Sequence, residues 1–183
     1  MNLDLSFWKN ASSKRKRIYL TIIIFVIAVI LTIIGSFVPL SSQDASSITN
    51  QLNQTMNTHK ANGTFTEYIF LNNFAICLVM FIPIIGPIIG FIIIFETGIG
   101  FSAIASVQGY PVWVALISEA ITPVFWLEFA AYSTAMAESI WLFRRLMQGR
   151  WRELKNTAIL IGICAAILIV SAIIEVWLIT VLS

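Results

Sequence analysis

The sequence predicts an all-α fold: a polytopic membrane helix bundle with about five transmembrane helices. Of its 183 residues, 58% are apolar and only 11% are charged, whereas soluble domains are about half apolar and a quarter charged. A soluble chain of this length has too little polar surface to cover so much apolar surface. The apolar residues also gather in long runs next to basic clusters. We therefore expect lipid to cover much of the protein, as a single membrane domain.

Residues 18–40 form the first, nearly unbroken apolar run. A helix of this length rises about 34 Å, which exceeds the roughly 30 Å hydrocarbon core of a bilayer. Residues 41–65 are rich in Ser, Thr, Asn and Gln and contain the only histidine, His59. This composition predicts a hydrophilic loop. Asn53 and Asn62 stand in Asn-x-Thr triplets, and the sequence leaves their glycosylation open.

The middle of the chain is apolar but is interrupted by proline and glycine residues. Breaks are expected near Pro83 and Pro87, at 109–111, and at Pro123, where Thr122-Pro123 is typical of a helix start. A last apolar run follows a second basic cluster. The predicted spans after the first are 66–85, 87–107, 112–143 (interrupted at 123) and 157–182.

Two clusters hold ten of the eleven Lys and Arg residues, and each borders a long apolar run. This arrangement favours topology anchors over a nucleic-acid surface, so no nucleic-acid partner is expected. If both clusters face the cytoplasm, an even number of crossings separates them. The segment 66–143 is too long and too often interrupted to form one transmembrane helix, but it is long enough to form three. The principal anchors are expected to be Lys14, Arg15, Lys16, Arg17, Arg144 and Arg145.

The charge clusters therefore predict a multi-pass protein of the cell membrane. Segments 1–17 and 144–156 are expected in the cytoplasm, whereas 41–65 and the C-terminus are expected outside. An alternative makes 87–107 or 112–122 a re-entrant segment, which Gly and Pro at its ends would permit. With one re-entrant segment, the number of membrane crossings between the two basic clusters would be odd instead of even.

Acidic residues at membrane depth are the candidates for a functional site. No Lys or Arg lies within the apolar segments that hold them, and an ionised carboxylate in hydrocarbon costs several kcal/mol. Distances from the predicted span ends place an Asn/Glu layer in the outer half of the membrane. Glu119 and Glu138 are instead expected near the two interfaces, in solvated positions. The predicted intramembrane polar cluster is Asn72, Asn73, Glu96, Glu128 and Glu175.

This layer has two interpretations: interhelical hydrogen bonding, or a site for a proton, a cation or a small ligand. Close helix packing is predicted separately, from small residues at four-residue spacing. The expected packing positions are Gly86 and Gly90, which form a G-x-x-x-G pair, and Ala131, Ala135 and Ser139.

Motifs for catalysis are lacking in the sequence, which has no Gly-rich phosphate loop, no H-E-x-x-H and no C-x-x-C. With a single histidine, a Ser-His-Asp or Cys-His system is not expected. Cys77 and Cys164 lie inside apolar runs and are expected to be small core residues. We therefore expect no enzyme, no catalytic residue, no cofactor and no metal site.

A set of short motifs occurs in a specific order. Asn72-Asn73 lies near the start of a span, Pro83 to Gly86 forms a break, and three more motifs follow. These are Glu96-Thr97-Gly98, then Pro123 with Glu128 and Ala131, and finally Ser171 to Glu175.

This order, over residues 65–180, resembles the integral-membrane family named after stage II sporulation protein M. Val124-Phe125 departs from the His-Gly common in that family. The resemblance implies an all-helical bundle without known catalysis that acts as a scaffold, and it aligns the family glutamates with Glu128 and Glu175.

The expected function is a non-catalytic membrane scaffold or accessory subunit of a larger membrane complex. Its partners would be membrane lipid and other membrane-protein subunits, in a homo- or hetero-oligomer. The alternative is a small permease- or channel-like protein that moves a proton, cation or small solute through the Asn/Glu layer. A third possibility is a small subunit of a membrane redox or transport enzyme whose active site lies on other chains.

Overall fold

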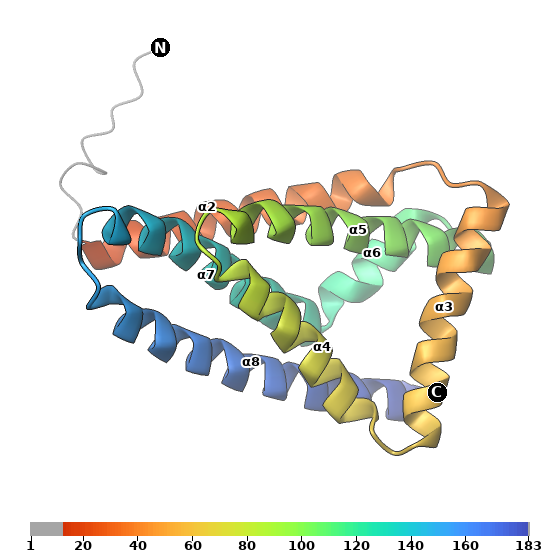
Figure 1. Cartoon of the computed structure of the whole chain (residues 1–183). Coiled ribbons are helices and arrows are strands. Elements are labelled where there is room, and N and C mark those ends of the chain that lie inside the picture. The colour runs from red at the N-terminus through yellow and green to blue at the C-terminus, as the bar shows by residue number, and fades with distance from the viewer. Residues whose placement is uncertain (1–12, 183) are drawn as a thin grey trace, which may run out of the picture.

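The computed structural model describes residues 13–182, so most of the predicted N-terminal segment 1–17 lies outside the described part. Within that part the chain forms seven helices and no strand (Figure 1). The helices are α2 (Ser13–Ser36), α3 (Ser42–Ala61), α4 (Phe65–Met80), α5 (Ile85–Gln108), α6 (Val112–Ile121), α7 (Pro123–Leu146) and α8 (Glu153–Leu182).

Three helices, α2, α5 and α8, are long and apolar enough to cross a membrane, and α6 with α7 provides a fourth if the bent pair is one span. The outward faces of α2 and α8 expose isoleucines, such as Ile30 at 49% and Ile173 at 55%. Such surfaces suit lipid rather than water. These features mark the chain as a membrane protein. At 16 residues, α4 is apolar but shorter.

Helix directions alternate along the bundle. The Thr32 hydroxyl donates to the carbonyl of Ile94 at 3.4 Å, and the Ser102 hydroxyl donates to that of Val38 at 3.2 Å, so α2 and α5 run parallel. In Figure 1, α8 runs in the same direction as these two helices, whereas α4 and α7 run in the opposite direction. The α7–α8 turn and the start of α2 lie at one end. At the other end, α3 lies across the bundle.

The polar segment predicted to be a loop is in fact the helix α3, so this prediction was wrong. Ser41 caps it by accepting a hydrogen bond from the amide of Asp44 at 3.1 Å. The buried stripe of α3 consists of small side chains, including Ala45 at 1% exposure and Thr49 at 5%. The segment is polar overall, so its composition favoured a loop, although its apolar positions do follow a helical period. His59 is not on a mobile loop either, because its ring stacks on Tyr68 with centroids 4.0 Å apart.

The break between α4 and α5 lies earlier than predicted. Helix α4 ends at Met80 rather than at 85, and α5 begins at Ile85, which places Pro87 inside the first turn of α5. The turn between them holds Ile84 at φ 70°, a conformation that is strained for a β-branched residue. A Cβ on Gly86 would collide with the carbonyl of Met80, so this close approach requires glycine.

The predicted interruption at Pro123 is a bend of 83° between α6 and α7, and Pro123 lies in the first turn of α7. Polar backbone groups at such a break need partners inside a membrane. The Thr122 hydroxyl donates to the carbonyl of Glu119 at 2.9 Å, and the Trp126 indole N–H donates to that of Ala120 at 2.8 Å. These two side chains satisfy carbonyls at the end of α6.

Small residues allow the helices to approach closely. Ala131, Ala135 and Ser139 are each 0% exposed on α7. The Ser139 hydroxyl donates to the carbonyl of Ile82 at 2.6 Å, in the turn between α4 and α5. A Cβ on Gly90 would meet the sulfur of Met136. The packing positions predicted from the sequence are therefore all buried contacts between helices.

A further close crossing joins α2 and α5, and its position on α2, Gly35, was not predicted from the sequence. A Cβ on Gly35 would collide with the carbonyl of Phe95, and a Cβ on Gly98 would collide with that of Thr32. The two backbones therefore touch directly. Gly100, two residues beyond Gly98 on the same helix, has open space around it.

We predict that Gly98→Ala destabilises the bundle by about 1–3 kcal/mol, because the new methyl group forces α2 and α5 apart. Gly100→Ala is the matched control and is expected to be neutral or to stabilise by up to about 1 kcal/mol, because alanine favours helix. Thermal unfolding in a mild detergent measures both. Equal melting temperatures for the two variants would contradict the close crossing.

Candidate functional site

Four of the five predicted polar residues line one cavity of about 540 Å³. Asn72 and Asn73 reach it from α4, Glu128 from α7 and Glu175 from α8. Residues of α3, including Leu52, line it as well. These four side chains therefore lie close together, around one cavity between α4, α7 and α8. We refer to Asn72, Asn73, Glu128 and Glu175 as the acid cluster.

The fifth residue, Glu96, is placed differently. Its side chain is exposed on α5 and lines a neighbouring cavity with Ile48 and Leu52 of α3. The two cavities share Thr97 and this part of α3. Glu96 is therefore near the acid cluster but outside it, because it lies on a different face of α5 from the one that enters the bundle.

Glu128 is the best-connected member of the acid cluster. Its Oε1 accepts a hydrogen bond from the Asn73 amide at 2.5 Å and lies 3.5 Å from the Ser171 hydroxyl. The same hydroxyl is 3.5 Å from the carbonyl of Val124. One carboxylate on α7 therefore joins α4 and α8. The Asn72 amide in turn is 3.5 Å from Asn73 Oδ1, at the exposed edge.

Glu119, which the sequence places near an interface, does not line this cavity. It lies on α6, three residues before the bend at Thr122. Among the described residues that line the cavity, none is Lys, Arg or His. His59 and Lys60 lie just behind the lining, because His59 stacks on Tyr68 and the Lys60 ammonium lies over the ring of Phe65.

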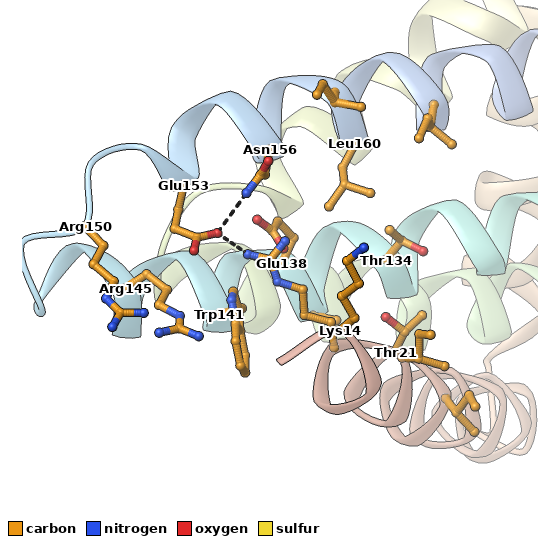
Figure 2. Close-up of a pocket in the computed structure, with 16 residues that line it drawn as sticks. Lys14, Thr21, Thr134, Glu138, Trp141, Arg145, Arg150, Glu153, Asn156 and Leu160 are labelled. Atoms are coloured by element: carbon orange, nitrogen blue, oxygen red, sulfur yellow. Dashed lines mark hydrogen bonds and ion pairs between the residues drawn. The ribbon is translucent and has the colours of Figure 1, made fainter. Parts of the chain in front are cut away.

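A second polar site lies at the opposite end of the bundle (Figure 2), and the sequence did not predict it. Glu138 is only 3% exposed, so the expectation of a solvated position was wrong. Its Oε1 accepts a hydrogen bond from the Thr157 hydroxyl at 2.7 Å, and its Oε2 lies 3.5 Å from Arg17 Nη1. Arg17 Nη2 also binds Glu153 at 2.5 Å. The cation that pairs with Glu138, which its own helix does not supply, is therefore Arg17 of α2.

Arg17 also lies over the Trp141 ring at 5.3 Å, and Arg145 lies over the same ring at 4.7 Å. These contacts bring the first basic cluster next to the second, so both lie at the same end. Among the predicted anchors, Arg17 is engaged inside the bundle. Lys14 and Arg145 line a cavity with it, whereas Arg15 and Arg144 are exposed and Lys16 is half-buried.

A dry layer separates the two polar sites. Cys77 and Cys164 are free thiols at 0% exposure, and both approach the carbonyl of Ala131, at 4.0 and 3.7 Å. Met136 and Leu168 are also fully buried in this layer. The cysteines are therefore small core residues, and the described part of the chain contains no group of three metal-ligating side chains.

Comparison with protein-family models, curated proteins and solved structures finds no match to the chain. The resemblance of residues 65–180 to the stage II sporulation protein M family therefore stays a prediction, which rests on the short motifs and their order.

We predict that Arg17→Met destabilises the protein by about 3–5 kcal/mol, because it leaves the buried Glu138 without a cation. The double variant Arg17→Met/Glu138→Met is expected to recover most of this loss, because it removes both charges and keeps the volume. Arg144→Met, at an exposed position, is the control. Unfolding in detergent measures all three, and an unchanged stability of Arg17→Met would contradict a structural role for the pair.

Proposed function

We propose that the chain crosses the membrane five times, with the two basic clusters in the cytoplasm. The alternating directions of α2, α4, α5, α7 and α8 support this arrangement. The contact between Arg17 and Glu153 supports it too, because it puts both clusters at one end. The polar helix α3, at the other end, would lie outside. Helix α4 rises only about 24 Å, but the apolar Phe81 and Ile82 extend its span.

Cysteine labelling tests this topology. The natural cysteines are buried, so the wild type serves as the blank. We expect a membrane-impermeant thiol reagent to label Asn53→Cys and Thr180→Cys from outside. Gln148→Cys should react only after the membrane is opened. All three positions are exposed. If Thr180→Cys instead labels together with Gln148→Cys, the number of crossings between them is even and the five-pass topology is wrong.

We propose that the protein functions as a non-catalytic scaffold or accessory subunit of a larger membrane complex. One observation carries this proposal: two acids on α7, the partly buried Glu128 and the buried Glu138, link this helix to its neighbours. Glu128 joins α7 to α4 and α8, and Glu138 joins α7 to α2 and α8. Polar links of this kind hold helices in register. The resemblance to a family with a scaffold role supports the same function, with membrane lipid and other membrane subunits as partners.

A small permease- or channel-like protein is the second candidate. It is favoured by the cavity that the acid cluster lines beside the bent α6–α7 pair. Broken helices with acids at membrane depth are typical of transporters for ions and protons. The dry layer around Cys77 and Cys164 separates this cavity from the other end. Transport would therefore require a second conformation in which that layer opens.

Purification and reconstitution distinguish the two candidates. A scaffold is expected to co-purify from its own membranes, in mild detergent with lipid retained, with other membrane proteins at stoichiometric amounts. Glu128→Leu should reduce both the amount of co-purified partner and the melting temperature, since it removes the contacts to Asn73 and Ser171. Glu67→Gln, an exposed acid on the same side, is the control.

The opposite outcome would be a chain that purifies alone and conducts protons in proteoliposomes, followed with a pH-sensitive dye. If Glu128→Gln and Glu175→Gln then abolish that flux and leave thermal stability unchanged, the permease function replaces the scaffold.

A further inference from the structure

A groove lies at the basic end of the bundle, between α2 and α8. It encloses a cavity of about 890 Å³, and its floor is the face of α7 that carries Thr134, Ala137, Glu138 and Trp141. Figure 2 shows Lys14 on one side of this space and Arg145 and Arg150 on the other, with Glu138 and Glu153 between them. Glu153 is paired with Arg17. Neither candidate function accounts for this groove.

The described residues that line the groove carry a net positive charge. Arg17 lies between Glu138 and Glu153 and binds both. Within the described part of the chain, the basic lining residues are Lys14, Arg17, Arg145 and Arg150, and the acidic ones are Glu138 and Glu153. An anion that enters therefore meets a positive surface. The ring of Trp141 supports the Arg145 guanidinium from one side.

The opposite part of the groove is apolar. Its walls are isoleucines of α2 and α8 whose side chains are about half exposed: Ile18 at 58%, Ile22 at 54%, Ile159 at 56% and Ile163 at 49%. They follow the basic residues along both helices, away from the α7–α8 turn. One ligand in this groove would therefore meet cations at one end and hydrocarbon along its length.

We propose that the groove binds one anionic phospholipid. The anionic headgroup lies at the basic end of the groove, between Lys14 on one side and Arg145 and Arg150 on the other. An acyl chain lies along Ile18 and Ile22 on α2 and along Ile159 and Ile163 on α8. Basic pockets between membrane helices are suited to such headgroups. The volume is also in the range of small-molecule sites, about 300–1000 Å³. A free phosphate would use only the basic end, and the isoleucine walls favour the lipid.

Native mass spectrometry of the full chain in detergent tests this proposal. The wild type is titrated with phosphatidylglycerol, phosphatidylcholine, glycerol phosphate and inorganic phosphate. We expect one phosphatidylglycerol to bind in preference to phosphatidylcholine, and no binding of the two soluble phosphates at the same concentration. Lys14→Gln/Arg150→Gln should weaken phosphatidylglycerol binding by about tenfold or more.

The matched control is Arg152→Gln/Lys155→Gln, which removes the same charge from the same end. All four side chains are exposed, so neither double variant disturbs the core, but Arg152 and Lys155 do not line the groove. The control is expected to bind phosphatidylglycerol like the wild type. Equal losses in both double variants would reveal attraction by net charge alone and overturn the proposal. Binding of inorganic phosphate as tight as that of the lipid would overturn it as well.

Discussion

The carboxylate of Glu138, buried on α7, accepts a hydrogen bond from Thr157 of α8 and lies beside Arg17 of α2. A charge in this position is tolerable only with partners in place, so it fixes where α2 and α8 lie against α7. Glu128 does the same for α4 and α8 at the other end of α7. The central position of α7 thus follows from two acids that each need neighbouring helices.

Between these two links, α7 presents small residues instead of polar ones. Ala131 and Ala135 are fully buried, and the two cysteine thiols approach the carbonyl of Ala131. Close packing gives the middle layer its dispersion energy, whereas the polar links at both ends set the register. A helix held at both ends and packed in between has little freedom to slide. This rigidity suits a support for partners better than a passage that must open.

The sequence predicts those features that depend on one helix at a time. Apolar runs predict the long helices, and the constant rise per residue predicts that Asn73, Glu128 and Glu175 share a level. Features that depend on how two helices are placed were missed. The Arg17–Glu138 pair requires the antiparallel register of α2 and α7, and the Gly35–Gly98 crossing requires the parallel register of α2 and α5. Helix α3 was missed for another reason: its composition, rich in Ser, Thr, Asn and Gln, favoured a loop although its apolar residues recur at helical spacing.

The bend between α6 and α7 separates this bundle from one built of straight helices. The 83° change of direction begins at Thr122, and the side chains of Thr122 and Trp126 satisfy carbonyls at the end of α6. Broken helices beside acids at membrane depth are typical of transporters. The bend therefore favours the permease-like alternative, together with the cavity that Glu128 and Glu175 line, whereas the links from Glu128 and Glu138 to neighbouring helices favour the scaffold.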